Sequence, residues 1–446
     1  MSNSFTDLHH LLIQLSEPIA ESLAKTNYAP PEGSQISVKA LIEPLLPHKA
    51  SPPNPNVDAS VKDFALACAL LSSSHSSTHD LLSWIPENLS TSANSAFREL
   101  SKAYCVAFGE RNAKRIGELG LDCGSVPEEQ RLVVELMPEV MPLLKERIKE
   151  SSIDKADEGG DEVSAASARV PVGFAIVAAY QFRWFATQVD YPHLGKLCAL
   201  VIPCALTAVD HWSPDVKGQG MISFIHLAKN VSAVELGSYG DVILDACCQN
   251  IASSDEIWHH VVEMSTLLVT CIQSGNPRSP WFERMLNEML SHLERQPRDK
   301  ERRVAWLKYI EPLLSAVGLV LLAHFRRIFP LILKWMHADD DETVLLVLER
   351  IQTILKLTWI RNTPYIGRLV DELTILYKEA AMKRAREEVR MHILQILILL
   401  QQCKGMQFEA AWGKHKDDPN LANLESSLSG RGTATVKTML FITAHL

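Results

Sequence analysis

Apolar residues recur at intervals of three and four along most of this chain, which is the spacing that places them on one face of an α-helix. Between 61 and 73, for example, Phe64, Ala67, Leu70 and Leu71 share a face. Period-two alternation, β-branched runs and Asn-Gly or Asp-Gly turns nowhere coincide, so no sheet is predicted. The pattern therefore predicts an all-α protein made of consecutive antiparallel helices.

A first helix is predicted over 5–25, and helical patterns resume at 61 after two Pro-rich interruptions. The last predicted helix, 363–403, is too long for one ordinary helix and should break within 378–388, where charged residues interrupt its apolar stripe. The helices predicted beyond residue 169 span 171–188, 193–209, 216–230, 233–251, 254–273, 281–295, 300–315, 317–337, 342–357 and 363–403.

The composition along the chain divides it into five regions. Residues 151–168 are acidic, rich in Gly and Ser and nearly free of large apolar side chains, which is typical of a disordered linker or loop. The predicted regions are an N-terminal helix with a Pro-rich arm (1–60), a helical segment (61–150), that linker (151–168), a helical repeat region (169–425) and a disordered tail (426–446).

Three segments share one internal pattern, in which a Pro lies in a first helix. The Pro residues are Pro142, Pro203 and Pro330, and after Pro203 and Pro330 come a polar turn with acidic residues and an apolar second helix. Such units cannot bury their apolar faces alone, so stacking them gives a HEAT- or armadillo-like α-solenoid. The Pro positions are 61 and 127 residues apart and not multiples of a repeat of about 40 to 47, so the solenoid should be irregular.

The net charge of the chain and the spacing of its cysteines indicate which kinds of partner and which cellular compartment to expect. A net charge of −9 over 446 residues argues against nucleic acid or an acidic membrane as the main partner. The nine cysteines have no C-x-x-C spacing, which indicates reduced, buried thiols of a cytoplasmic or nuclear protein. No signal peptide is recognised, and the most apolar windows are about half the roughly 20 residues that span a bilayer, so no membrane anchor is predicted.

The stretch VDHWSPDVKGQG, residues 209–220, is the densest in unusual residues. A phosphate-binding loop would need its glycines at the start of a helix after a strand, and here Gly218 and Gly220 fall inside a predicted helix. A turn between two helices explains more, since Ser213 can cap the second helix and Pro214 can occupy its first turn. We therefore interpret the stretch as a turn, with the glycines allowing close helix packing.

Other candidate chemistry is weak. Adjacent histidines such as His259 and His260 point about 100° apart on a helix and cannot share a metal, and Cys247 beside Cys248 is a poor redox pair. No nucleophile, kinase or Walker motif is present, so no catalytic, cofactor-binding or metal-binding residue is assigned and the protein is predicted not to be an enzyme. The recurrent aromatic residues should be core, with one or two exposed as anchors on a binding face.

Two segments contain motifs that match a known family. The first is the turn above, and the second is a later helix of the form GL.LL.H...IFP followed by TW.R. The matching residues are Pro203, Leu206, Asp210, Pro214, Lys217 and Gly220 in the first segment, and Gly318, Leu319, Leu321, Leu322, His324, Ile328, Phe329, Pro330, Thr358, Trp359 and Arg361 in the second. In these residues the chain resembles the Tti-two family, the smallest subunit of the TTT complex (Tel-two, Tti-one and Tti-two).

The resemblance implies a non-enzymatic scaffold without a cofactor. Its partners would be Tti-one-like and Tel-two-like subunits, the heat-shock protein 90 machinery and kinases related to phosphatidylinositol 3-kinase, of the TOR and ATM/ATR classes. The alternatives are a solenoid adaptor of the nuclear-transport or phosphatase-scaffold type, and an enzyme on a helical scaffold. The enzyme would need a deep pocket that gathers perturbed carboxylates or histidines.

Overall fold

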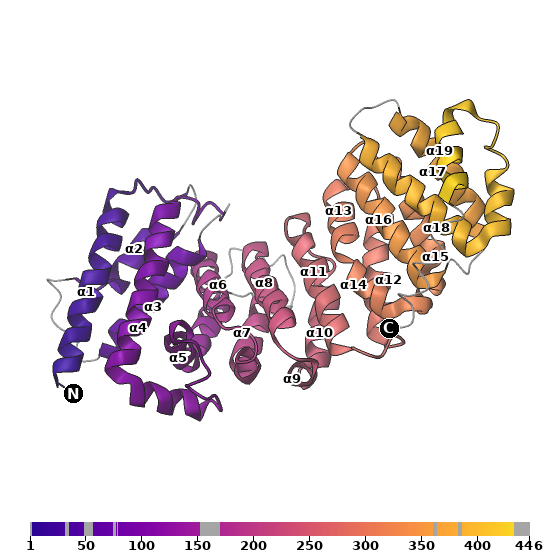
Figure 1. Cartoon of the computed structure of the whole chain (residues 1–446). Helices are drawn as coiled ribbons and strands as arrows, with labels where there is room; N and C mark the ends of the chain where they lie inside the picture. Colours follow the sequence, from indigo (N-terminus) through magenta and orange to yellow (C-terminus); the bar gives the residue numbers. More distant parts are fainter. Residues whose placement is uncertain are drawn as a thin grey trace, which may run out of the picture. The chain divides into compact units, whose positions relative to one another are not determined.

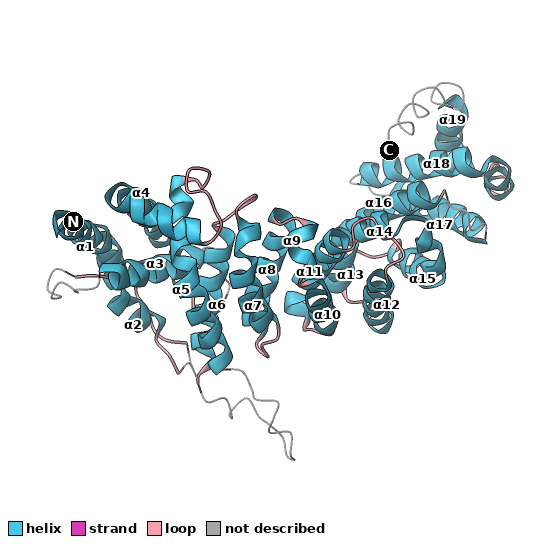
Figure 2. Cartoon of the chain, turned by 90° about the horizontal axis from the view of Figure 1, so that it is seen from below, coloured by secondary structure: helices cyan, strands magenta, loops and turns pink. Residues whose placement is uncertain are grey.

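A computed structural model describes residues 2–31, 35–48, 57–74, 77, 79–151, 170–359, 364–381 and 386–431. Within these ranges every regular element is a helix, which confirms the all-α prediction (Figure 2). The chain forms two compact units, Met1–Met264 and Ser265–Leu446, and the boundary falls inside helix α11 (Asp255–Ile272). We describe each unit by itself.

Unit 1 consists of two rows of helices (Figure 1). In one row α4 packs on α5, α5 on α7 and α7 on α10, and in the other α3 packs on α6 and α6 on α8. Contacts of α3 with α4, α5 with α6 and α7 with α8 join the rows. The elements are α1 (Ser2–Lys25), α2 (Val38–Ile42), η1 (Glu43–Leu45), α3 (Val57–Ser73), α4 (Glu87–Glu118), α5 (Glu128–Glu150), α6 (Val172–Thr187), η4 (Leu194–Leu197), α7 (Cys198–Val209), α8 (Pro214–Asn230), α9 (Ala233–Gly237), α10 (Gly240–Asn250) and α11.

Unit 2 repeats this two-row arrangement. Helix α15 packs on α12 and α17, while α16 packs on α13 and α18, and contacts of α15 with α16 and of α17 with α18 join the rows. The elements are α12 (Pro280–Arg295), α13 (Lys300–Tyr309), α14 (Glu311–Val317), η5 (Gly318–His324), α15 (Phe325–Trp335), α16 (Asp341–Thr358), α17 (Pro364–Ala381), α18 (Glu387–Trp412), η7 (Pro419–Leu421) and α19 (Ala422–Arg431).

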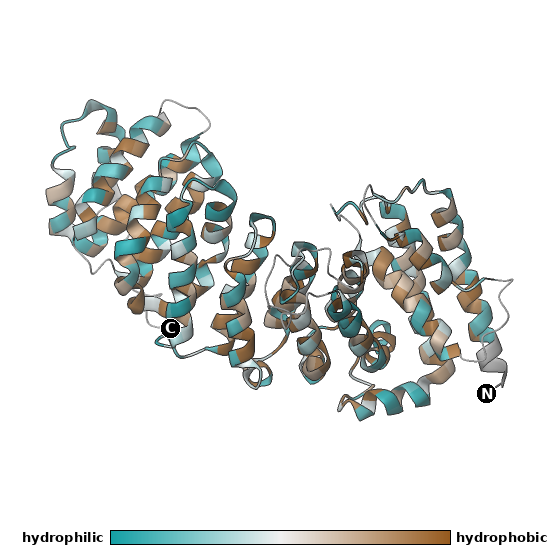
Figure 3. Cartoon of the chain, turned by 180° about the vertical axis from the view of Figure 1, so that it is seen from behind, coloured by the Kyte–Doolittle hydropathy of each residue, from teal (hydrophilic) through white to brown (hydrophobic). Residues whose placement is uncertain are grey.

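The three Pro-containing segments are the helix pairs that the sequence predicts. Pro142 lies inside α5, Pro203 inside α7 and Pro330 inside α15, and these helices pack on α6, α8 and α16 respectively. Many helices combine apolar positions with polar ones along their length (Figure 3). Aromatic side chains such as Phe182, Phe224 and Phe329 are buried among the helices. Together these features establish the irregular α-solenoid of helix pairs.

Several helices that the pattern predicts as continuous are broken. The predicted helix 317–337 is split because Gly318 has φ of +54°, a left-handed conformation that ends α14 and leads into the 3₁₀ turn η5. The predicted helix 300–315 breaks at Ile310, between the end of α13 and the start of α14 at Glu311, and Pro312 lies in the first turn of α14. The predicted helix 233–251 breaks after Gly237. The break predicted within 378–388 is confirmed, since α17 ends at Ala381 and α18 begins at Glu387.

The described residues cover parts of the predicted N-terminal arm, linker and tail. Helix α1 packs on α3 and α4 and buries Leu12 and Ile19, so the N-terminal helix belongs to unit 1. Ser151 is the one described residue of the predicted linker 151–168. The predicted tail 426–446 begins within α19, which continues to Arg431, and residues 432–446 lie outside the described part of the chain.

Buried charges tie helices together in unit 1. The carboxylate of Glu135 on α5 is buried and accepts hydrogen bonds from Tyr104 Oη at 2.8 Å, Asn112 Nδ2 at 2.6 Å and Arg115 Nη1 at 2.8 Å, all on α4. Three donors compensate the cost of taking this carboxylate out of water. This cluster fixes the register of α4 against α5.

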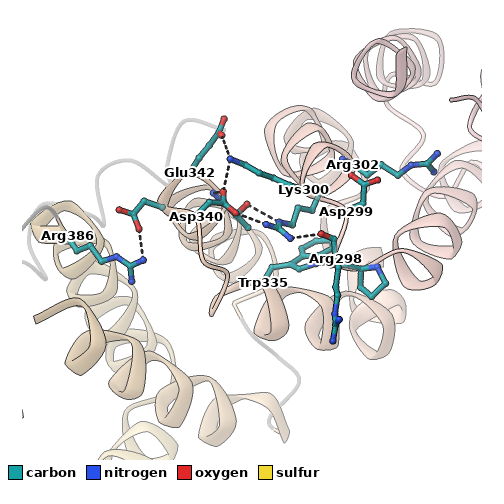
Figure 4. A network of polar contacts seen from close by, with 12 residues as sticks. Arg298, Asp299, Lys300, Arg302, Trp335, Asp340, Glu342 and Arg386 are labelled. Atoms are coloured by element: carbon teal, nitrogen blue, oxygen red, sulfur yellow. Dashed lines mark hydrogen bonds and ion pairs between the residues drawn. The ribbon is translucent and has the colours of Figure 1, made fainter. Parts of the chain in front are cut away.

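In unit 2 a polar network surrounds Asp340, which caps α16 (Figure 4). Its carboxylate accepts from Thr343 N at 2.9 Å and from Arg303 Nη2 at 2.6 Å, and Lys300 Nζ lies 3.6 Å away. Burial alone would raise the pKa of Asp340, but hydrogen bonds from Thr343 and Arg303 outweigh it and lower that pKa to about 2. Arg386 at the start of α18 pairs with Asp341 at 2.6 Å, so the network links α13, α16 and α18.

Candidate functional site

A polar pocket of about 580 Å³ opens in unit 1 where α6, α8 and α11 meet the residues that follow α3. It lies within the size range of ordinary ligand pockets. Its described lining residues are Ser73, Ser77, His79, Asp80, Tyr180, Arg183, Pro214, Asp215, Gly218, Gln219, Glu256, Ile257, His259 and His260.

Arg183 and Tyr180 form the positively charged side of this pocket. The Arg183 guanidinium lies 5.1 Å from the centre of the Tyr180 ring and donates a hydrogen bond to the carbonyl oxygen of Ser73. The Tyr180 hydroxyl is 3.0 Å from Ser77 Oγ. Burial lowers the pKa of Arg183, although an arginine side chain stays charged at neutral pH.

His79 and Asp215 lie next to each other in the lining of the pocket. His79 Nε2 is 3.4 Å from Asp215 Oδ2, and His79 Nδ1 accepts a hydrogen bond from Leu81 N at 3.1 Å. The hydrogen bond with Asp215 raises the pKa of His79, and burial opposes it. Because Nδ1 accepts from the backbone, the neutral ring carries its proton on Nε2, toward Asp215. Both ring nitrogens are therefore engaged, which leaves neither to act as a base on a substrate.

The adjacent histidines of α11 lie at the third side of the pocket. The rings of His259 and His260 have their centres 3.8 Å apart. Burial lowers the pKa of His260 to about 4, and the neighbouring His259 and Arg183 act in the same direction. His260 is therefore uncharged at neutral pH. Among the described residues, no three His, Cys, Asp or Glu side chains are grouped so that they could hold a metal ion.

The stretch 209–220 forms the turn that the sequence predicts. Helix α7 ends at Val209, Asp210 follows as its C-cap, and Pro214 begins α8 with Asp215 in the first turn. One detail is wrong, because Ser213 occupies the N-cap position but its side chain makes no capping hydrogen bond. Asp210, at the end of α7, lines a separate pocket of about 460 Å³ between α5, α7 and α10.

His211 and Trp212 hold this turn to the end of α5. His211 Nε2 is 3.0 Å from Ser151 Oγ, and Trp212 Nε1 donates to the Ser151 carbonyl oxygen at 3.0 Å. His211 Nδ1 accepts from Ser213 N at 3.1 Å, and burial lowers the pKa of His211 to about 4, so its ring is neutral. The turn is therefore held in place by hydrogen bonds to Ser151, which lies 60 residues earlier in the sequence, and not by a capping hydrogen bond from the Ser213 side chain.

Lys217 and Gly220, two further family-like residues of this segment, contribute to the packing of α8 on its neighbours. Lys217 Nζ donates to Asn250 Oδ1 at 3.1 Å, which joins α8 to the end of α10. A Cβ added at Gly220 would lie 2.8 Å from Ala208 Cβ and 3.0 Å from Val209 N, so α8 approaches α7 closely at this point. Close packing at Gly220 agrees with the interpretation from the sequence.

The second family-like segment belongs to unit 2, so the structure does not place the two segments in one site. Gly318 begins η5 and Pro330 lies inside α15. Trp359 caps α16 at its C-terminal end with φ of +49°, and 54% of its surface is exposed. Arg361 lies outside the described residues.

One stretch of the described residues, Glu311–Trp335, is long and apolar enough to cross a membrane by length and composition. In the structure it is divided among α14, η5 and α15, and half of its most apolar window is buried within the protein. The nine cysteines all lie within the described residues and form no disulfide, and Cys68, Cys198, Cys204, Cys247 and Cys248 are buried.

Comparison with known proteins places the chain beside one uncharacterized plant protein. The chain is 57% identical to the uncharacterized protein At2g39910 of Arabidopsis thaliana over 429 residues, which cover 96% of each protein. The chain belongs to the same family as this Arabidopsis protein. No family model matches the chain, so the resemblance to the Tti-two family rests on the two segments alone.

Solved structures similar to the chain share little sequence with it. Kap121p bound to Pho4p is 10% identical, with a TM-score of 0.45 over 92% of this chain and 44% of that chain. An engineered protein is 12% identical, with a TM-score of 0.39 over 89% of this chain and 98% of that chain.

Proposed function

We propose that the protein is a non-catalytic scaffold that binds other proteins along its helical repeats. The observation that supports this proposal is the two-row stack of antiparallel helix pairs in each unit. Such stacks present extended surfaces on which neighbouring repeats each contribute contacts. The exposed Trp359 at the end of α16 and the exposed Met391 on α18 are of the kind that anchors protein partners.

The polar pocket supports binding better than catalysis. A histidine that acts as the base of an enzyme needs a free ring nitrogen and a pKa near neutrality. His79 has both nitrogens engaged, and His260 has its pKa lowered to about 4, which makes it a weak base at neutral pH. We therefore propose that the protein is not an enzyme and needs no cofactor.

Within the class of scaffolds, we propose a role like that of the Tti-two family. The protein would join Tel-two-like and Tti-one-like subunits and act with heat-shock protein 90 in the maturation of kinases related to phosphatidylinositol 3-kinase, in the cytoplasm and nucleus. This role is supported by the residues of the two family-like segments, of which Pro214 begins α8 after the α7–α8 turn and Gly220 allows α8 to approach α7 closely.

Purification of the tagged protein from its own cells, followed by mass spectrometry, tests both levels of the proposal. Stoichiometric Tel-two-like and Tti-one-like subunits are expected for the Tti-two-like role. A Ran-type GTPase or a phosphatase subunit in their place would refute that role and indicate the other adaptor classes. Recovery of the protein without any stoichiometric partner would contradict the scaffold itself. A fluorescent fusion, imaged in the same cells, tests the compartment.

A further inference from the structure

The lining of the polar pocket in unit 1 divides into a buried floor and an exposed rim. On the floor, Tyr180 and Gln219 are only 6% and 7% exposed, and Arg183 is half-buried beside them. On the rim, Asp80 and Glu256 are exposed. The floor therefore carries the positive charge of Arg183 and the rim carries negative charges.

Polar groups at this floor lack partners within the described part of the chain. Gln219 Oε1 and His260 Nδ1 are buried and have no hydrogen-bond partner there. The Arg183 guanidinium has five N–H donors, and the described residues accept one hydrogen bond from it, at the Ser73 carbonyl. Buried polar groups without partners are rare in native proteins and often mark a position that water or a ligand occupies.

Charge decides which ligand this pocket favours. Arg183 is the one permanent cation among its described lining residues, and no described carboxylate pairs with it. A phosphate dianion on Arg183 would be repelled by the carboxylates of Asp80, Asp215 and Glu256. A carboxylate carries one negative charge and matches the planar guanidinium, and a neighbouring cation would be attracted by the rim.

We propose that the pocket binds a partner's carboxylate side chain on Arg183, in a segment whose flanking basic side chains contact Asp80 and Glu256. This inference rests on the proposed scaffold function and names the chemistry of one partner segment. The Gln219 amide can rotate to donate from its NH₂ group, and the neutral His260 ring can donate from Nδ1 in the tautomer that carries the proton there. These two donors complete the hydrogen bonds of the carboxylate.

Three capped peptides and acetate test the proposal against the full-length protein, with the ring NMR signals of His259 and His260 as the readout. The peptides are Gly-Lys-Glu-Lys-Gly, a version with Gln in place of Glu, and a version with Gln in place of both Lys. The first should bind at least about tenfold more tightly than the second, because the charge-assisted hydrogen bond is lost. Acetate alone should bind more weakly than the first peptide, and tighter binding of acetate would indicate a free small carboxylate as the ligand.

Variants of the protein assign the effect to the pocket. Arg183→Gln should weaken the Glu peptide about tenfold and leave the Gln peptide unchanged, and the exposed double variant Asp80→Asn, Glu256→Gln should weaken the Glu peptide without affecting folding. Glu99→Gln, which removes one exposed charge from α4, is the matched control and should bind as the wild type does. Circular dichroism melting shows whether each variant is folded.

Equal binding of the Glu and Gln peptides, or no binding of either at concentrations on the order of 10 mM, would overturn the proposal. If Arg183→Gln fails to fold, the double variant still decides, since its unchanged affinity would overturn the proposal as well. Partners that purify equally with the wild type and with the double variant would refute this pocket and leave the scaffold function standing. Absence of partners from both would refute the scaffold function, while the peptide titrations would still report on the pocket.

Discussion

Gly218 and Gly220 lie two residues apart inside α8 and offer a paired test of how closely α7 and α8 pack. Both are buried, and replacing either by Ala removes the same backbone flexibility from a helix interior. A Cβ at Gly218 would meet Ile257 Cγ2 at 3.6 Å, which is ordinary van der Waals contact. A Cβ at Gly220 would lie 2.8 Å from Ala208 Cβ and 2.9 Å from Val209 Cγ1.

The magnitudes follow from these distances. Ala is favoured over Gly in a helix interior by about 1 kcal/mol, so Gly218→Ala should stabilise unit 1 by about 0.5 to 1 kcal/mol. At Gly220 the same gain is opposed by overpacking, which costs about 1 to 3 kcal/mol when backbone or packed side chains must move. Since Val209 N is part of the backbone, the neighbour cannot simply rotate away. Gly220→Ala should therefore end about 1 to 3 kcal/mol less stable than Gly218→Ala.

Urea unfolding followed by circular dichroism at 222 nm measures this difference, and Gly220→Leu should destabilise further. The two Ala variants should have similar dependence on denaturant, so that their midpoints report stability. If Gly220→Ala proved as stable as Gly218→Ala, the close approach of α7 and α8 at this point would be refuted.

Three other predictions address particular contacts. Glu135→Gln should destabilise unit 1 by about 2 kcal/mol in urea unfolding, because the buried amide loses the negative charge and turns an N–H donor toward side chains that are themselves donors. The control Glu139→Gln on the same helix, about half exposed, should change stability by less than about 0.5 kcal/mol. Trp212→Phe should cost about 1 kcal/mol in the same assay through loss of the hydrogen bond to the carbonyl of Ser151, and an unchanged midpoint would contradict that bond. The pKa of Asp340 in the folded protein is about 2, below its ordinary value of 3.8, so its contribution to the free energy of unfolding is fully present above about pH 4 and is lost as the pH falls toward 2. The free energy of unfolding of unit 2 should therefore depend less on pH over this interval in Asp340→Asn than in the wild type. Equal pH dependence of the two proteins would disprove the assignment.

Local sequence signals predicted the helices and the turn of the first family-like segment. The spacing of apolar residues locates most helices to within a few residues, and Pro214 marks the start of α8 because a proline needs no N–H partner there. The glycine that ends α14 was missed, because Gly318 stands in an apolar run whose periodicity continues past it. Nothing in the neighbouring sequence shows that its φ must be positive.

The polar pocket could not be predicted from the sequence. His79 and Asp215 are 136 positions apart. His79 follows α3, Asp215 belongs to α8 and Arg183 to α6, so only the packing of α3 and α8 on α6 brings the three residues together. Asp215 follows Pro214 at the start of α8, and nothing around it in the sequence shows that it lies beside His79. His259 and His260 were noted as a pair, but the sequence cannot show that one of them lies at a pocket floor and the other on its exposed side.

The anchoring of Ser151 by His211 and Trp212 bears on how this family tolerates change. The end of α5 is held by a turn that lies about 60 residues later in the chain. Insertions or deletions after Ser151 can therefore accumulate during evolution without disturbing the pairing of α5 with α7. Homologous chains should vary most in length between α5 and α6, while a Trp or another side chain able to bond the same carbonyl is retained at the position of Trp212.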